Sequence, residues 1–210
     1  QTRLDILVQQ KKLTQAEVDS LIDPKLDLTL GDTMIENFIT QYQIPEGLAL
    51  NYVIDGKEYL IPMVTEEPSV IAAASHGAAI VKRSGGFTSE LKERLMIGQI
   101  VIEQVKDATK LAQELEQKQA KLLQLANEAH PSIVCRGGGA REIKVRILAP
   151  DLISLDLIVD VKEAMGANML NTMLEACASY LRTELNTEIL LSILSNYATR
   201  CLVKVTCEIP

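Results

Sequence analysis

The chain has 210 residues, of which 47% are hydrophobic and 3% aromatic, and its formal net charge is −7. This composition suits one large or two small globular domains with an aliphatic core, and it argues against a disordered chain. The acidic balance argues against a nucleic-acid-binding protein, and because the sequence shows neither a bilayer-spanning apolar run nor a secretory leader, we expect a soluble, cytoplasmic protein that does not bind membranes.

The predicted elements begin with a helical arm. Apolar residues recur at helical spacing over residues 1–22, and residues 14–17 form a Thr-x-x-Glu capping box that predicts a second short helix. Two apolar runs at 48–54 and 58–64 then flank Asp55-Gly56, which is a strong hairpin signal. Both ends of the sequence fall inside predicted structure, so we expect a piece of a longer polypeptide.

A pair of glutamates follows the hairpin. Glu66 and Glu67 precede Pro68, which is expected to open a helix of small residues that runs to about Arg83 and ends at Gly85-Gly86. The unpaired N–H groups of a first helical turn can bind an anion or a polarised carbonyl. A carboxyl beside them can donate a proton when burial raises its pKa. Acids near helix starts also commonly just complement the helix dipole, so spacing leaves both interpretations open.

The rest of the chain alternates strands and helices. Periodicity predicts strand, helix, strand, strand, helix, strand, which is the ferredoxin-like split βαβ order. The corresponding residues are 98–105, 107–129, 142–149, 152–160, 161–185 and 188–195, with a further strand at 202–205. No G-x-G-x-x-G opens a helix, and Gly137-Gly138-Gly139 alone is weak evidence for a nucleotide loop. Glycine inside a helix costs about 1 kcal/mol relative to alanine, so Gly166 indicates close contact with a strand or a ligand.

The cysteines predict neither disulfides nor a metal site. None of the four forms a C-x-x-C pair, and neither of the two histidines stands at zinc-ligand spacing. We therefore expect reduced, partly buried thiols and no bound metal.

Five segments together resemble one family, in the family's order. They are Glu36-Asn37-Phe38-Ile39 with Gln43-Ile44-Pro45, Glu66-Glu67-Pro68-Ser69, Gly137-Gly138-Gly139, Ala164-Met165-Gly166-Ala167-Asn168 with Asn171-Thr172-Met173, and Ile193-Leu194-Ser195-Asn196. These blocks resemble those of the class II (bacterial) 3-hydroxy-3-methylglutaryl-CoA reductases, and the similarity runs from about Arg3 to the end of the chain. Five ordered blocks are far more specific than any one of them.

The resemblance implies an α+β fold. Residues 1–95 would form an N-terminal helical arm and the first part of a large α/β substrate and dimerisation domain. Residues 96–206 would form a small ferredoxin-like NAD(P)-binding domain, and residues 207–210 would return into the large domain. The implied reaction is the reduction of 3-hydroxy-3-methylglutaryl-CoA to mevalonate and CoA with two hydrides from NADPH or NADH, or the reverse. The implied assembly is a homodimer or higher oligomer with shared active sites.

On the substrate side, the resemblance assigns Glu67 as the catalytic proton donor to the thioester or aldehyde oxygen. It assigns Ser69 to the acyl portion of the substrate, and Glu36 and Asn37 to the substrate side of the subunit contact. The family's catalytic lysine, aspartate and histidine would lie in a C-terminal portion beyond Pro210, so the 210 residues alone are expected to be inactive.

On the cofactor side, the resemblance implies contacts from His130, Glu163, Met165, Gly166, Asn168 and Asn196. Glu163 stands where the family usually has aspartate. His130 lies seven residues before Gly137, where an NAD-preferring relative would have an aspartate for the adenosine ribose. Losing that carboxylate removes repulsion toward a 2′-phosphate, which an imidazolium would attract. We therefore expect NADPH to be accepted, with the preference between NADPH and NADH left open, the alternative being that His130 belongs to a solvent-facing loop.

Two other functions fit parts of the sequence. A non-catalytic ferredoxin-like binding or regulatory subunit would explain the split βαβ order and the acidic charge, but not the joint presence of Glu-Glu-Pro-Ser and Met-Gly-Ala-Asn. A reductase of another CoA ester would share the cofactor chemistry. Substrate profiling separates these, because a site built to hydrogen-bond a substrate group rejects analogues that lack it.

Overall fold

The computed structural model describes residues 3–22 and 27–209, and it confirms a fold of mixed helix and sheet. Its internal contacts divide the chain into two compact units, Gln1–Tyr52 with Tyr59–Ala79 and Val53–Glu58 with Ile80–Pro210. The domain boundaries after residues 95 and 206 stay predictions. In the described part of the chain, no helix is both long and apolar enough to cross a membrane.

Short helices precede the hairpin; they are α1 (Arg3–Gln9), α2 (Gln15–Ile22) and α3 (Leu28–Met34). The capping box is confirmed at the start of α2. The Thr14 backbone N–H donates to Glu17 Oε2 at 2.7 Å, and the Glu17 N–H donates to Thr14 Oγ1 at 3.3 Å. Helix α3 is not predicted by the sequence analysis, because it has seven residues with Gly31 among them and no full helical repeat.

The hairpin is also confirmed. Strands β1 (Glu46–Ile54) and β2 (Lys57–Val64) pair in a two-stranded sheet. Both turn residues have positive φ, 50° at Asp55 and 78° at Gly56, which is what the favoured two-residue hairpin turns require. Helix α4 (Val70–Lys82) follows.

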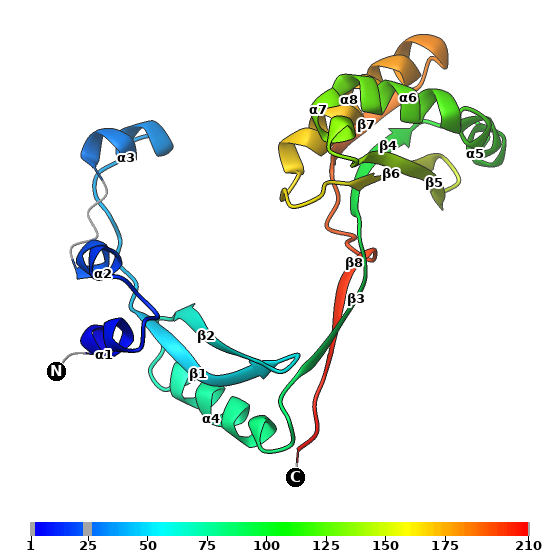
Figure 1. The fold of residues 1–210 in the computed structure, drawn as a ribbon. Helices are drawn as coiled ribbons and strands as arrows, with labels where there is room; N and C mark the ends of the chain where they lie inside the picture. Colours follow the sequence, from blue (N-terminus) through cyan, green and yellow to red (C-terminus); the bar gives the residue numbers. More distant parts are fainter. Residues whose placement is uncertain (1–2, 23–26, 210) are drawn as a thin grey trace. The chain divides into compact units, whose positions relative to one another are not determined.

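A four-stranded antiparallel sheet forms the centre of the second unit. Its strands are β4 (Met96–Glu103), β5 (Gly139–Ala149), β6 (Leu152–Asp160) and β7 (Glu188–Leu194), in the order β5-β6-β4-β7. Each pair of strands joined through helices, β4 with β5 and β6 with β7, has one strand between its members, as in a split βαβ arrangement. One face is covered by α5 (Ala108–Gln117), α6 (Gln119–Ala129), α7 (Pro131–Cys135) and α8 (Ala167–Glu184), as Figure 1 shows.

The core lies between that face and the helices. Ile100 on β4 and Leu174 on α8 are both 0% exposed. Close packing depends on Gly98 of β4, since a Cβ there would lie 2.6 Å from Leu174 Cδ1. Cys177 of α8 is also buried, and burial raises the pKa of its thiol to about 12. At neutral pH this thiol is therefore protonated, and it donates to the Leu122 carbonyl at 3.4 Å.

Two long predicted helices have different bounds in the structure. The predicted helix over 107–129 is divided at Lys118, where φ is −89° and ψ is 6°. The predicted helix over 161–185 begins only at Ala167, because Gly166 has a φ of +90° that a right-handed helix does not accommodate. Gly166 therefore lies directly before a helix and not inside one, which corrects the prediction.

A second antiparallel pair forms a ribbon of β3 (Thr88–Arg94) and β8 (Cys201–Thr206). The sequence analysis does not predict β3, because its Thr-Ser-Glu-Leu-Lys-Glu-Arg sequence has almost no apolar alternation. The chain runs from β3 directly into β4, and it runs from β7 through residues 195–200 into β8.

Candidate functional site

The glutamate pair lies in a tight turn between β2 and α4. Thr65 closes this turn with its side chain: Oγ1 accepts from the Glu67 backbone N–H at 3.1 Å and donates to the Glu67 carbonyl at 3.3 Å. The Thr65 backbone N–H donates to the Pro45 carbonyl at 3.2 Å, which ties the turn to the start of β1. Glu66 and Glu67 are both exposed.

Ser69, and not Pro68, directly precedes α4. Ser69 has a φ of +70° and its carbonyl accepts from the Ala73 N–H at 2.8 Å. The prediction that Pro68 occupies the first helical position is therefore wrong, because a left-handed residue separates it from Val70. A non-glycine residue in this conformation costs on the order of 1–3 kcal/mol, and such residues cluster at functional sites. This strain coincides with the predicted substrate-binding serine.

The predicted subunit-contact residues lie in a turn after α3, within a segment that exposes apolar side chains. Glu36 is exposed, and Asn37 has a φ of +55°. Around them, Ile35, Ile39 and Tyr42 are 57%, 90% and 82% exposed. Large apolar groups with this much contact to water are typical of a surface that another chain or segment covers.

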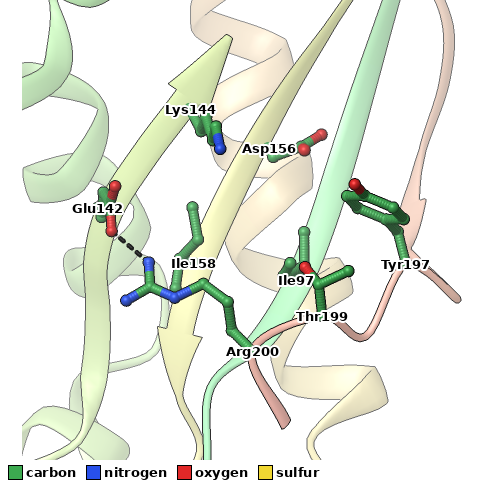
Figure 2. A pocket seen from close by; sticks show the side chains of 8 residues that line it. All are labelled: Ile97, Glu142, Lys144, Asp156, Ile158, Tyr197, Thr199 and Arg200. Atoms are coloured by element: carbon green, nitrogen blue, oxygen red, sulfur yellow. Dashed lines mark hydrogen bonds and ion pairs between the residues drawn. The ribbon is translucent and has the colours of Figure 1, made fainter. Parts of the chain in front are cut away.

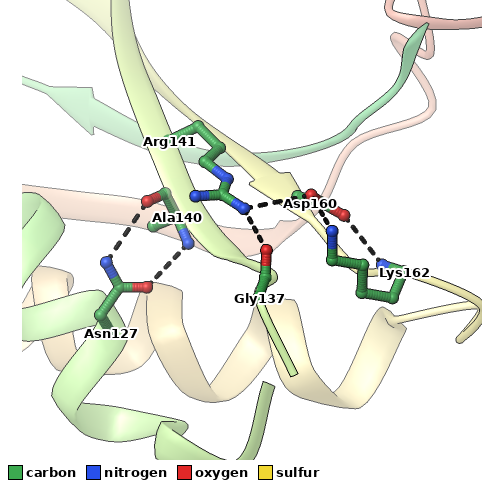
Figure 3. A network of polar contacts seen from close by, with 6 residues as sticks. All are labelled: Asn127, Gly137, Ala140, Arg141, Asp160 and Lys162. Carbon is green, nitrogen blue, oxygen red and sulfur yellow. Dashed lines mark hydrogen bonds and ion pairs between the residues drawn. The ribbon is translucent and has the colours of Figure 1, made fainter. Parts of the chain in front are cut away.

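The three-glycine turn between α7 and β5 packs against neighbouring backbone (Figure 3). Gly137 and Gly139 have φ values of +79° and +105°. A Cβ on Gly138 would lie 2.5 Å from the Asp160 carbonyl oxygen, and one on Gly139 would lie 2.4 Å from Asn127 Oδ1. Asn127 holds the start of β5, since its Oδ1 accepts from the Ala140 N–H at 2.8 Å. Packing therefore requires glycine at Gly138 and Gly139, whereas at Gly137 the positive φ favours it.

Asp160, the last residue of β6, joins two cations beside this turn (Figure 3). Its Oδ2 lies 3.2 Å from Arg141 Nη2 and 3.0 Å from Lys162 Nζ. Arg141 also donates to the Gly137 carbonyl. Burial alone would raise the pKa of Asp160, but the hydrogen bonds from Lys162 and Arg141 outweigh it and hold that pKa below its usual value. Asp160 therefore stays ionised at neutral pH, where it pairs with both cations.

Helix α8 begins next to the same corner. Gly166 is its N-cap and supplies no side chain to the first turn. A Cβ on Gly166 would lie 2.6 Å from Val161 Cγ1. Met165 is 71% exposed, and Asn168 is exposed as well. The N–H groups of the first turn of α8 therefore have no side-chain cap, which suits an anionic ligand.

Three other predicted cofactor residues lie near the ends of secondary structure. His130 joins α6 to α7, is half-buried, and has Nδ1 3.2 Å from Ser132 Oγ. Glu163 is exposed and pairs with Arg94 at 3.3 Å. Asn196 follows β7, whose last residue donates its N–H to Asn171 Oδ1 on α8 at 3.0 Å.

The structure brings part of the predicted site together. The three-glycine turn and the segment from Asp160 to Gly166 meet at one end of the four-stranded sheet. Glu67 and Ser69 belong to the first unit, whereas the predicted cofactor residues belong to the second. Sequence reasoning misses four residues of this corner: Asn127, Arg141, Asp160 and Lys162. An acid that ends a long apolar strand, two residues before a lysine, was the available signal. Across 3–22 and 27–209, no cluster of side chains could hold a metal ion.

Comparison with known proteins identifies the family. The sequence matches the family model described as hydroxymethylglutaryl-coenzyme A reductase over residues 1–210. It is 40% identical over 199 residues to 3-hydroxy-3-methylglutaryl-coenzyme A reductase of Archaeoglobus fulgidus, which covers 93% of this chain and 46% of that protein. It is 37% identical over 166 residues to the probable reductase of Borreliella burgdorferi, covering 78% of this chain and 37% of that protein.

A solved structure agrees over almost the whole chain. The class II 3-hydroxy-3-methylglutaryl-CoA reductase of Streptococcus pneumoniae, bound to NADPH in open conformations, superposes with a TM-score of 0.92 at 44% identity, covering 99% of this chain and 57% of that one. The chain thus spans roughly half the length of these relatives. Because the family model matches every residue of the sequence, the chain belongs to the 3-hydroxy-3-methylglutaryl-CoA reductase family.

Proposed function

We propose that this chain is the proton-donor and cofactor-binding part of an enzyme that reduces 3-hydroxy-3-methylglutaryl-CoA to mevalonate and CoA with two NADPH. The proposal rests above all on the 0.92 TM-score to a class II reductase bound to NADPH, over 99% of this chain. The strained Ser69 near Glu67 supports a substrate site, and the glycine-lined end of the sheet supports a cofactor site.

The residues at the end of the sheet suit a dinucleotide. A pyrophosphate would accept from the uncapped first turn of α8, and Arg141 with Lys162 would offset its charge. The proposed contacts come from His130, Glu163, Met165, Gly166, Asn168 and Asn196. NADPH, when bound, supplies the two hydrides. Asn127 and Arg141 hold the turn around Gly137 without a ligand. Binding therefore requires little further ordering of the backbone.

Glu67 carries the acid chemistry that this chain contributes. Reduction of a thioester to an alcohol needs two protons as well as two hydrides, and Glu67 donates at the thioester or aldehyde oxygen. A carboxyl can do so near neutral pH only when its charged form is disfavoured. Glu67 is exposed in the first unit, so the proposal requires substrate and the remainder of the protein to shield it from water. Ser69 contacts the acyl portion.

The whole protein is proposed to be a cytoplasmic homodimer or higher oligomer with shared active sites, and its C-terminal portion supplies the family's lysine, aspartate and histidine. The exposed apolar residues Ile35, Ile39 and Tyr42 around Glu36 and Asn37 support a subunit contact there.

The full-length protein is expected to oxidise NADPH only when 3-hydroxy-3-methylglutaryl-CoA is present, with two NADPH consumed per mevalonate. The 210-residue chain alone is expected to show no turnover. Absorbance at the NADPH band and mass spectrometry of the product test both statements, and the intact mass of each polypeptide establishes what was assayed. Turnover by the 210 residues, or a full-length protein that accepts only another CoA ester, contradicts the proposal.

His130 is expected to favour NADPH over NADH. In the full-length protein, His130→Asp should lower the ratio of kcat/KM for NADPH to that for NADH by about 10-fold, because a carboxylate there repels a 2′-phosphate at a cost of about 1.4 kcal/mol. The control is His76→Asp, which changes the other histidine, on α4. Equal or better kcat/KM with NADH in the unaltered enzyme contradicts this role.

A further inference from the structure

The second face of the four-stranded sheet carries polar side chains beside the apolar Ile97 and Ile158. On β6, Ser154 and Asp156 are buried, at 0% and 2% exposed. Arg146 of β5 donates to both Asp156 oxygens at 2.5 and 2.9 Å, and its guanidinium lies 4.9 Å from the centroid of the Tyr197 ring. The cleft of about 400 Å³ on this face is lined by residues of the sheet and by Tyr197, Thr199 and Arg200, as Figure 2 shows.

Arg200 lies at the edge of this cleft and binds two carboxylates from different sheets. Its Nε and Nη2 donate to the two oxygens of Glu93 on β3, at 2.7 and 2.9 Å. Its Nη1 donates to Glu142 on β5 (Figure 2). The hydrogen bonds to Glu93 and then to Glu142 raise the pKa of Arg200 above its ordinary value, so the guanidinium stays charged. A planar guanidinium can fill both roles at once, whereas a lysine ammonium cannot hold a bidentate carboxylate in one plane.

The bridge stands where the ribbon joins the sheet. The chain enters the four-stranded sheet from β3 and leaves it toward β8, and Arg200 is the residue before β8. The Leu95 N–H donates to the Arg200 carbonyl at 2.8 Å, and the register of the ribbon is irregular between Leu91 and Arg94. The backbone ladder is therefore interrupted close to the point at which the side chain of Arg200 connects the two sheets.

The exposure of these groups decides what the bridge can do. The side chains of Arg200, Glu93 and Glu142 are 33%, 40% and 47% exposed. Ion pairs this accessible to water add little to the free energy of unfolding. A guanidinium that binds one carboxylate through two hydrogen bonds and a second carboxylate through a third still fixes the orientation of the two carboxylates strongly, because each N–H must align with its acceptor. The bridge is therefore better suited to fixing the orientation of the sheet relative to the ribbon than to stabilising the folded state.

We propose that Arg200 is a positioning residue that holds the four-stranded sheet at one angle to the β3–β8 ribbon by binding Glu93 and Glu142 together. Building on the proposed function, this angle sets how the sheet presents bound NADPH to the substrate. Arg200 is not itself a proposed cofactor contact, although Asn196 of the same 195–200 connection is one, so the role of Arg200 differs from cofactor binding.

Arg200→Met in the full-length protein is expected to lower kcat on the order of 10-fold, while the NADPH dissociation constant from fluorescence titration changes less than about twofold. Small misplacements of reacting groups are enough to cause such losses. Hydrogen exchange of the Leu95 amide and of the β3 amides should become faster. The matched control is Arg182→Met, which removes an exposed arginine from the last turn of α8.

Three further variants keep the proposal testable if Arg200→Met folds poorly. Glu142→Gln preserves shape and removes one arm of the bridge, so a smaller kcat loss is expected. Pairing Glu142→Arg with Arg200→Glu restores opposite charges and should recover part of the kcat that Arg200→Glu alone loses.

Unchanged kcat and unchanged amide exchange in both Arg200→Met and Glu142→Gln would overturn the proposal. A loss of NADPH affinity that matches the loss of kcat would overturn it as well. If the unaltered protein is not a reductase, the proposed function fails, and the exchange rates alone decide whether Arg200 joins ribbon and sheet.

Discussion

Glu67→Gln in the full-length protein is expected to reduce kcat for 3-hydroxy-3-methylglutaryl-CoA reduction by at least about 100-fold, within the range that a general acid contributes. Glutamine preserves the size of the side chain and the backbone turn that Thr65 closes, but it cannot deliver a proton. The dissociation constant of NADPH should not change, because Glu67 belongs to the first unit and the proposed cofactor contacts belong to the second. Steady-state kinetics and fluorescence titration measure the two quantities.

The neighbouring glutamate supplies a matched control. Glu66 has the same charge and is also exposed, so Glu66→Gln alters the charge near the start of α4 equally. If Glu66 and Glu67 only complement the helix dipole, both variants should have the same small effect. Equal losses in the two variants, or a Glu67→Gln enzyme that retains full activity, would show that Glu67 is not the proton donor.

Much of the fold could be predicted because its signals are local. The Thr14–Glu17 capping box and the Asp55-Gly56 turn each satisfy their own backbone within a few residues, and both are present in the structure. The strands of the four-stranded sheet also carry a local signal, since β6 is a nearly continuous buried apolar run and β5 alternates apolar and polar residues. Strand β3 lacks such a signal because its polar residues are ordered by pairing with β8, more than 100 residues along the chain.

The candidate site could be predicted only in part, for a related reason. Motif residues such as Ser69 and Gly166 stand in ordered blocks, but their positive φ values are visible only in the structure. The predicted starts of α4 and α8 are wrong because a residue with positive φ does not change the spacing of apolar residues in the sequence. Asp160, Arg141 and Asn127 escape notice because each acts through a partner that is remote in sequence, as the separation of 19 positions between Arg141 and Asp160 illustrates.

Gly166→Ala is expected to produce the largest structural effect at the cofactor end. Alanine at a φ of +90° carries a backbone penalty of roughly 1–2 kcal/mol, and its Cβ would also lie 2.6 Å from Val161 Cγ1. Val161 is 1% exposed and packed in the core, so it has no space to move away. The first turn of α8 must then shift. We expect NADPH affinity to fall at least about 10-fold, equivalent to about 1.4 kcal/mol, together with a lower thermal midpoint.

Gly85→Ala separates backbone strain from the collision. Gly85 has a φ of +104°, but no atom lies within 4 Å of a Cβ built there. The Gly85→Ala variant of the full-length protein should therefore lose only the stability that positive φ costs and should bind NADPH normally. A Gly166→Ala variant with the same thermal midpoint as Gly85→Ala would mean that Val161 yields without cost. If that variant also bound NADPH as tightly as the unaltered protein, the start of α8 would not be part of the cofactor site. A Gly166→Ala variant with a lower thermal midpoint than Gly85→Ala and with weaker NADPH binding would show that the left-handed N-cap serves both packing and cofactor recognition. That result would explain why glycine stands at this position.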